Sequence, residues 1–279
     1  MPGTLYIVAT PIGNLEDITL RALRVLKEVD GIAAEDTRHT KKLLTHYDIR
    51  TPLTSYHEHN ERAAAPALVE RMLGGESIAL VSDAGTPGIS DPGYRLVVAA
   101  VAAGIQVTPV PGPSALIAAL SAAALPTDRF VFEGFLPEKK KQRRERLLAL
   151  RDEKRTLVCY EAPHRLKDAL GDIENILGDR TVAIAREMTK VHEEFMRGPI
   201  REIMTKIAHC EVRGEVVILV QGGAGDPRGS EEALRQDVLQ LHASGMRVKE
   251  IADLLGEKYA LPKKHIYRIA LELRNAFNR

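Results

Sequence analysis

The chain has 279 residues, of which 44% are hydrophobic and 28% charged, and its net charge is +1 at pH 7. This composition indicates a soluble globular protein, and the length favours two domains over one. No apolar run is long enough to span a membrane, and the only two cysteines, Cys159 and Cys210, exclude a disulfide scaffold and a cysteine-rich zinc site. The N-terminus lacks the pattern of a signal peptide, so we expect a cytoplasmic protein.

The first part of the chain alternates strand and helix patterns. Strands are expected at residues 4–9, 31–35, near 53, 78–81 and 106–110. Helices are expected between them, at residues 17–29, 37–47, 61–73 and 92–104. Five strands joined by helices predict a mostly parallel sheet covered on both faces. In the last of these helices, Asp91 is expected to be the N-cap, Pro92 the first helical residue and Gly104 the stop.

Three prolines at residues 109–113 predict a linker, because proline fits poorly inside the flanking elements. The α/β pattern then resumes. Helices are expected at residues 114–124, 138–152 and 163–177, and strands at 130–133, 156–160, 181–187, 193–199 and 214–220. Hairpin and crossover signals together predict a mixed sheet. The glycine-rich residues 222–227 predict a flexible boundary.

Residues 231–279 have helical patterns throughout. Two amphipathic helices, marked by Ile251 and Ile266, are separated by residues 261–264, a spacing that fits a helix-turn-helix-like pair. From Met246 onward there are eight Lys or Arg and four Asp or Glu. A solvated helical cap and an RNA-contacting module both remain open. We therefore predict an N-terminal α/β domain at 1–112, a second α/β domain at 113–226 and a helical module at 231–279.

Special residues gather in six loops that follow strands. The loops cover residues 9–14, 34–38, 81–93, 111–115, 160–165 and 185–194. Ligands of open α/β sheets bind at the carboxyl ends of the strands, so six such loops in two domains predict a cleft site between the domains. The sequence has no G-x-G-x-x-G, Walker or G-x-S-x-G motif. His57 and His59 lack a second cluster of ligands, so no metal site is expected.

The loop at residues 81–93 reads V-S-D-A-G-T-P-G-I-S-D-P-G. Its three glycines and two prolines allow close backbone approach to a ligand in one fixed shape. The other loops have simpler alternatives. Asp36 or Thr37 is open to the role of helix cap, and residues 185–194 to that of a salt-bridged surface turn.

Basic residues supply a second indication. Residues 138–146 contain six Lys or Arg and two Glu, which fits either a solvated helix face or part of a phosphate-binding channel with Lys41, Lys42, Arg165, Arg186 and Lys190. Aromatic residues are only 4% of the chain and tryptophan is absent, so platforms for base stacking are scarce. The pattern favours phosphate contact over base reading.

Taken together, six motifs resemble the ribosomal RNA small subunit methyltransferase I family of the tetrapyrrole methylase superfamily. They are Y-I-V-A-T-P-I-G-N-L, A-E-D-T-R, the 81–93 loop, V-P-G-P-S-A, Y-E-A-P-H-R and A-R-E-M-T-K, in this order over nearly the whole chain. The resemblance implies two α/β domains with S-adenosylmethionine in the cleft between them, and a homodimer. It also implies 2′-O-methylation of a cytidine in the decoding region of 16S rRNA in the small ribosomal subunit. Ser82-Asp83-Ala84 replaces the superfamily's usual G-D-P, a departure that the ribosomal branch shares.

The resemblance also assigns cofactor-binding residues, while the chemistry of the reaction and the charge pattern supply candidates for catalysis and RNA contact. The expected cofactor-binding residues are Pro11, Ile12, Ser82, Asp83, Ala84, Gly85, Thr86, Ile89, Ser114, Ala115, Glu161, Ala162 and Glu215. The candidate catalytic residues are Glu187, Glu161 and Lys190, with Glu193 and Asp36 as further candidates for a base. The expected RNA-contacting residues are Arg38, Lys139, Lys140, Lys141, Arg143, Arg144, Arg165, Arg186, Lys263 and Lys264.

Two rival functions share this fold. A tetrapyrrole methyltransferase would need a broad apolar trough, whereas this chain offers runs of Lys and Arg. A non-catalytic RNA-binding protein would be expected to lose the glycine loops, which are intact here.

Overall fold

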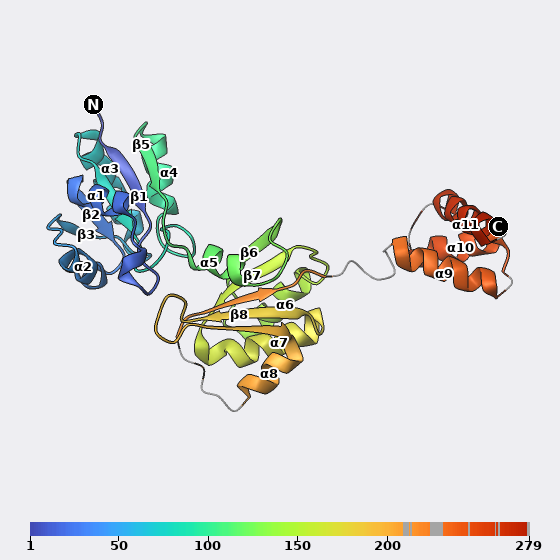
Figure 1. Cartoon of the computed structure of the whole chain (residues 1–279). Helices are drawn as coiled ribbons and strands as arrows, with labels where there is room; N and C mark the ends of the chain where they lie inside the picture. Colours follow the sequence, from blue (N-terminus) through green and yellow to red (C-terminus); the bar gives the residue numbers. More distant parts are fainter. Residues whose placement is uncertain are drawn as a thin grey trace. The chain divides into compact units, whose positions relative to one another are not determined.

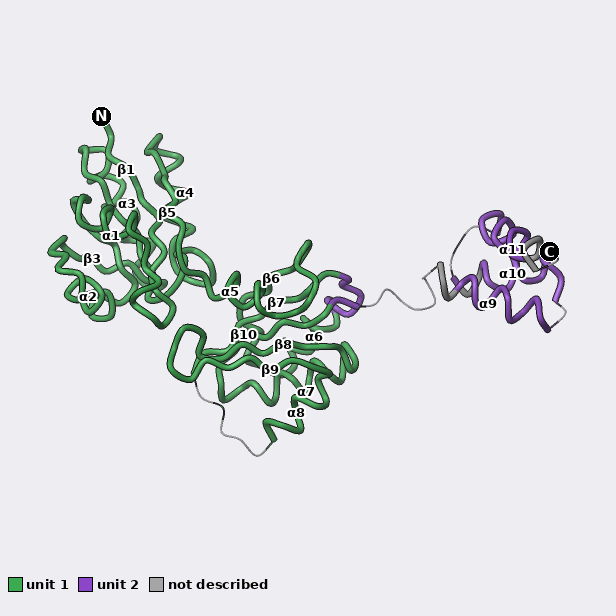
Figure 2. Tube along the Cα trace, in the orientation of Figure 1, with its two compact units in different colours: residues 1–148, 155–221 green, residues 149–154, 222–279 purple. Residues whose placement is uncertain are grey.

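The computed structural model describes residues 1–208, 212, 214–223, 231–244, 246–259, 261 and 263–277. The chain divides into two compact units, one of residues 1–148 and 155–221 and the other of residues 149–154 and 222–279 (Figure 2). The first unit holds two five-stranded sheets, and the second holds the C-terminal helices. Among the described residues, no helix combines the length and the apolar character needed to cross a membrane.

The first sheet is parallel throughout, as predicted (Figure 1). Its strands are β1 (Thr4–Val8), β2 (Gly31–Ala34), β3 (Leu53–Ser55), β4 (Ile78–Val81) and β5 (Gln106–Val110), in the order β3-β2-β4-β1-β5. Pro109 lies inside β5, which corrects its assignment to a linker. An edge strand tolerates proline because its outward N–H position needs no ladder partner.

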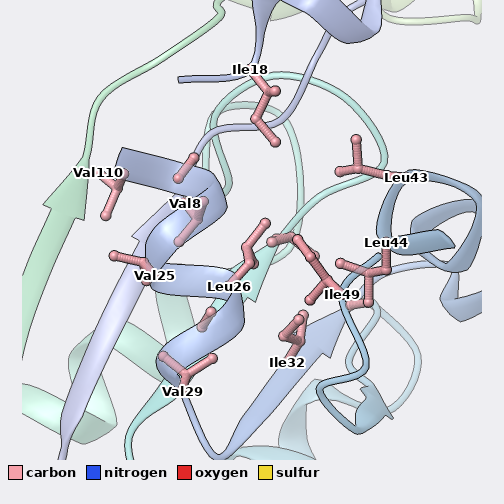
Figure 3. Close-up of a cluster of buried hydrophobic side chains, with 14 residues drawn as sticks. Val8, Ile18, Val25, Leu26, Val29, Ile32, Leu43, Leu44, Ile49 and Val110 are labelled. Atoms are coloured by element: carbon pink, nitrogen blue, oxygen red, sulfur yellow. The ribbon is translucent and has the colours of Figure 1, made fainter. Parts of the chain in front are cut away.

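Both faces of this sheet are buried. Ala79 and Val81 of β4 pack with helices α1 (Leu20–Glu28) and α2 (Thr37–His46). Ile78 and Leu80 point to the other face and pack with α3 (Glu61–Leu73) and α4 (Tyr94–Ala102). Figure 3 shows the first of these clusters, with Leu26 of α1 and Ile32 of β2 in it. A continuous apolar strand is what burial on both faces requires. The turn η1 (Leu15–Asp17) precedes α1.

Helix α4 begins later than predicted. Its N-cap is Gly93, at φ 154°, and the helix starts at Tyr94, so the assignment of Asp91 as the cap is wrong. Residues 88–93 form a tight turn, in which Gly88 and Ser90 also have positive φ values of 81° and 66°. A sequence pattern does not reveal such a turn, because Asp-Pro is also a common way to start a helix.

The second sheet is mixed, as predicted. It contains β6 (Phe130–Phe135), β7 (Thr156–Glu161), β8 (Thr181–Arg186), β9 (Glu194–Pro199) and β10 (Val216–Val220), in the order β6-β7-β10-β8-β9. Only the β6–β7 pair among these is parallel. Helix α5 (Ala115–Ala122) covers one face, where Leu116, Ala119 and Leu120 pack with Val158 and Val217.

Further helices accompany the second sheet: α6 (Lys140–Ala149), the turn η2 (Pro163–Arg165), α7 (Leu166–Leu177) and α8 (Ile200–Ile207). Figure 1 shows α7 and α8 together beside this sheet. The sequence reading missed α8, although its buried residues Ile200, Ile203 and Ile207 have helical spacing. A helix of only eight residues gives a weak periodic pattern in the sequence.

The second unit contains three helices within its described residues, α9 (Glu231–Ala243), α10 (Val248–Tyr259) and α11 (Lys263–Phe277). They share a core of Leu234, Val238, Ile251, Leu255 and Ile266. The predicted amphipathic helices around Ile251 and Ile266 are therefore confirmed. Most of the predicted boundary at 222–227 lies outside the described residues, and the domain limits at 112 and 226 stay predictions.

Candidate active site

Loops from both sheets of the first unit line one cavity of about 450 Å³, a size typical of small-molecule sites. Its wall is part acidic and part apolar. The lining residues are Ile12, Glu35, Asp83, Ala84, Gly85, Thr86, Ile89, Ser90, Asp91, Ser114, Ala115, Phe135, Tyr160, Glu161, Ala162, Pro163, Met188, Glu215, Val216 and Val217.

Short hydrogen bonds tie these loops together. Thr10 and Gly85 exchange two backbone hydrogen bonds of 2.9 and 3.0 Å, which join the loop after β1 to the loop after β4. Gly85 has φ 78°, so a side chain there would strain this bridge. The Thr86 hydroxyl donates to the carbonyl of Pro113 at 3.3 Å, which brings the start of α5 to the same place.

Most expected cofactor-binding residues lie in this wall. Two do not: Pro11 is absent from the lining, and Ser82 is buried, with its hydroxyl 3.3 Å from the carbonyl of Ala84. The sequence reading also missed several lining residues. Glu35, Tyr160 and Met188 stand in loops that the sequence had singled out, whereas Phe135 and Val217 had no sequence signal beyond hydrophobicity.

Glu161 is the most buried carboxylate in the wall. Its Oε1 atom lies 2.7 Å from the Arg165 guanidinium and accepts the backbone N–H of Ala162 at 2.8 Å. Its Oε2 atom is buried and has no hydrogen-bond partner in the structure. Because a buried unpaired acceptor is costly, this atom is suited to receive a donor from a ligand.

Glu187 and Lys190 form a second group, at the end of β8. Lys190 Nζ lies 2.9 Å from Glu187 Oε1 and 3.3 Å from Glu215 Oε2. The hydrogen bond from Lys190 lowers the pKa of Glu187, and the two carboxylates outweigh partial burial and raise the pKa of Lys190. Of these three residues only Glu215 lines the cavity.

Three further carboxylates, those of Glu35, Asp83 and Asp91, line the cavity. Burial, and then the neighbouring Asp83, raise the pKa of Glu35. Burial and then Glu35 raise the pKa of Asp91 to about 6. Asp83 Oδ1 accepts the backbone N–H of Asp36 at 3.0 Å. The side chain of Asp36 itself caps α2 by accepting the N–H of Arg38 at 2.8 Å, which supports the helix-cap alternative for this residue.

The expected RNA-contacting residues differ in accessibility. Lys139, Lys140, Lys141 and Lys264 are exposed. Arg143 is only 3% exposed and pairs with the buried Asp172, so we leave it out of the RNA-contacting set.

The other arginines of this set are engaged within the chain. Arg144 also contacts Asp172, at 2.7 Å, although half of it is exposed. Arg165, Arg38 and Arg186 pair with Glu161, Asp36 and Glu194, and Lys263 pairs with Asp253. Of these, Arg165 is mainly structural, because its Nη2 atom also donates to the carbonyl of Leu136 at 2.6 Å.

No group of three or more His, Cys, Asp or Glu suited to a metal ion occurs in the part of the chain that the structure describes. The cavity and its rim offer carboxylates, the ion-paired Lys190 and apolar surface. A cationic organic ligand fits such a wall.

Residues 4–204 match the family model of the tetrapyrrole (corrin/porphyrin) methylases. A protein named ribosomal RNA small subunit methyltransferase I from Halalkalibacterium halodurans is 51% identical over 272 residues, 96% of this chain and 94% of the relative. A protein of the same name from Synechocystis sp. is 48% identical over 274 residues, 97% and 98% of the two chains.

Solved structures share the fold at low identity. Uroporphyrin-III-C-methyltransferase from Thermus thermophilus has a TM-score of 0.55 at 21% identity, covering 78% of this chain and 94% of that chain. The Thermus thermophilus uroporphyrin-III C-methyltransferase complexed with S-adenosyl homocysteine has the same TM-score of 0.55 at 18% identity, covering 78% and 97%. The matches over nearly full length at about half identity decide the assignment: the chain belongs to the ribosomal RNA small subunit methyltransferase I family of the tetrapyrrole methylases.

Proposed function

We propose that this chain transfers the methyl group of S-adenosylmethionine to the ribose 2′-oxygen of a cytidine in the decoding region of 16S rRNA. The observation that carries the proposal is the cavity of about 450 Å³ at the strand ends, which is lined by most of the residues expected to bind the cofactor. Family membership supports the methyltransferase activity and the ribosomal substrate.

The wall suits the cofactor. S-adenosylmethionine has a sulfonium, an ammonium and a carboxylate, and so carries one net positive charge that Glu35 and Asp83 favour. The unpaired Glu161 Oε2 offers an acceptor to its hydroxyl or amino groups. Ile12, Ile89 and Phe135 offer apolar surface to its adenine ring. A protein of this fold bound to S-adenosyl homocysteine supports the same assignment.

The cofactor supplies an electrophilic methyl group when bound, and the protein supplies orientation. Holding the acceptor hydroxyl in line with that methyl group contributes on the order of 7–11 kcal/mol in favourable cases. The hydroxyl must also lose its proton, which a carboxylate in the wall can accept.

The exposed lysines at residues 139–141 and Lys264 are proposed to hold rRNA phosphates. A ribosomal substrate supports a cytoplasmic location, which we propose as well. We further propose a homodimer, which light scattering on the purified chain tests directly.

The experiment supplies S-adenosylmethionine and small subunits that lack the modification, and then maps alkali-resistant linkages in the rRNA. One new resistant linkage at a cytidine in the decoding region is expected, since a 2′-O-methyl group blocks cleavage. Asp83→Ala is the matched control and is expected to abolish cofactor binding in calorimetry. If no linkage becomes resistant with the wild-type protein, the 2′-O assignment is wrong.

A further inference from the structure

One carboxylate of the cavity wall is held only by a neutral side chain, that of Ser82. Asp91 lines the cavity with Asp83, Thr86 and Ser114. Helix α4 takes Gly93 as its N-cap, so Asp91 does not serve as a cap. Across the described residues, no Lys, Arg or His nitrogen lies within ion-pair distance of the Asp91 carboxylate.

The backbone fixes Asp91 in this position. Ser90 has φ 66°, a left-handed conformation that non-glycine residues adopt rarely. A Cβ atom added to Gly93 would lie 3.1 Å from both Gly88 N and Leu80 Cδ2, so the loop is folded back tightly on β4. Strained backbone of this kind persists at functional sites because the surrounding structure holds it.

The groups that face Asp91 come from several elements. They are Glu35 after β2, Ser82 and Asp83 after β4, Tyr160 of β7 and Glu215 before β10. None of them is a cation. Burial, followed by the charge of Glu35, therefore raises the pKa of Asp91 to about 6. A carboxylate of this kind is ionised at pH 8 and is also more basic than an ordinary aspartate, as a general base should be.

Glu161, Glu187 and Asp83 each have an ion-pair or hydrogen-bond partner, although the Oε2 atom of Glu161 stays unpaired. Glu161 Oε1 is held by Arg165 and the N–H of Ala162. Glu187 accepts from Lys190 Nζ and from the N–H of Glu215, at 2.9 and 3.2 Å, which lowers its pKa and makes it a weak base. Asp83 receives the N–H of Asp36.

Glu35 is the nearest competitor of Asp91. The backbone of Asp83 hydrogen-bonds to its carboxylate and offsets part of the rise in its pKa. Asp91 receives a hydrogen bond from the Ser82 side chain but none from the backbone, and its pKa still rises to about 6.

We propose that Asp91 is the base that takes the proton from the hydroxyl group that becomes methylated. This inference rests on the methyltransferase function proposed above. The hydroxyl oxygen forms a bond to the methyl carbon, the carbon–sulfur bond breaks with its electron pair left on sulfur, and the O–H proton moves to the Asp91 carboxylate. Asp91 then returns the proton to water, so no further reactant is needed.

The test compares the wild type with Asp91→Asn, Glu35→Gln and Asp128→Asn, the last an exposed carboxylate on the turn before β6. In single-turnover methylation at pH 8, Asp91→Asn is expected to be slower by about 10²-fold or more. Its affinity for S-adenosyl homocysteine, measured by calorimetry, is expected to stay within about threefold of the wild type. Asp128→Asn is expected to match the wild type in both.

A second readout is independent of activity. Carbon-13 NMR of the protein with labelled aspartate carboxyls is expected to show one carboxyl titrating near pH 6, lost in Asp91→Asn. The wild-type methylation rate is expected to fall as the pH drops below about 6.

A normal methylation rate in Asp91→Asn overturns the proposal. If Glu35→Gln is slow while Asp91→Asn is normal, Glu35 is the base. Loss of S-adenosyl homocysteine binding in Asp91→Asn overturns it as well, since the residue would then hold the ligand. A wild type that binds the cofactor product but methylates no rRNA overturns the proposed function instead.

Discussion

Glu161 at the end of β7 and Arg165 at the end of η2 form an ion pair of 2.7 Å, which leaves the second carboxylate oxygen of Glu161 without a partner. One carboxylate oxygen of Glu161 therefore stabilises the fold through Arg165, and the other is open to a ligand. One substitution of Glu161 tests both roles.

Glu161→Ala removes the buried ion-pair partner of Arg165, whose side chain is only 15% exposed, and leaves it the exposed Glu138 at 3.4 Å. We expect the free energy of unfolding in urea to fall by about 3 kcal/mol and the affinity for S-adenosylmethionine to fall with it. The control is Glu138→Ala, which removes the exposed partner of Arg165 at 3.4 Å and is expected to cost less than about 1 kcal/mol. Equal stability of Glu161→Ala and wild type would contradict this role.

Asp91 is expected to cost stability at neutral pH. Its pKa is about 6 in the folded chain and 3.8 in a model peptide, so between these values the folded state binds more protons than the unfolded state. Stability therefore falls as pH rises from about 4 to 6. Because the side chain is partly solvated, we expect Asp91→Asn to raise the free energy of unfolding at pH 8 by about 1 kcal/mol and to change nothing at pH 4. Urea unfolding at both pH values measures this, and a stabilisation that is the same at both would contradict it.

Gly214 keeps space for Glu187. It has φ 81°, and a Cβ atom there would collide with the Glu187 carboxylate. Gly214→Ala is expected to displace Glu187 from Lys190 and to lower the methylation rate. Gly178→Ala is the matched control, since Gly178 has φ 86° but no atom within 4 Å of an added Cβ. Both variants are expected to lose about 1–3 kcal/mol of stability from backbone strain, measured by urea unfolding. If Gly178→Ala lowers the rate equally, strain rather than Glu187 is responsible.

The exposed lysines at residues 139–141 are expected to contact phosphates. Replacing all three by Ala should weaken subunit binding and reduce the slope of log affinity against log salt by about 2. Cofactor affinity should not change. A control variant that replaces the exposed Arg21, Lys27 and Arg50 by Ala removes the same charge elsewhere. Equal loss of subunit binding in the two variants would mean that only net charge matters.

The Arg143–Asp172 pair is expected to stabilise the fold without serving the reaction. Burial raises the pKa of Asp172, but hydrogen bonds from Arg144 and Arg143 outweigh it and lower the pKa overall. Its contribution is thus complete above about pH 4 and is lost as pH falls further. Asp172→Ala should cost about 3–5 kcal/mol at pH 7, whereas Arg201→Ala, in an exposed pair with Glu174, should cost less than about 1 kcal/mol. Activity per folded molecule should stay normal in both, as measured by methylation assays on the soluble protein.

The two sheets and the loops that line the cavity could be predicted from sequence, since apolar runs between glycine and proline signals reflect local backbone preferences. The parallel order of the first sheet followed from strands alternating with helices. The motifs around Asp83, Ser114 and Glu161 marked the edge at which the cavity lies, because parallel strands end together.

Only the tertiary structure showed which charged residues are buried in ion pairs, which are exposed and which line the cavity. Arg143 stands in the same basic run as Lys139, but its place on α6 buries it against Asp172, which lies 29 residues further along the chain. The sequence predicted Asp91 as a helix cap. In the structure the turn at residues 88–93 precedes α4, which starts at Tyr94, and Asp91 lines the cavity instead. Burial and charge partners come from distant segments, so the pKa and the role of a carboxylate are properties of the folded chain and not of its local sequence.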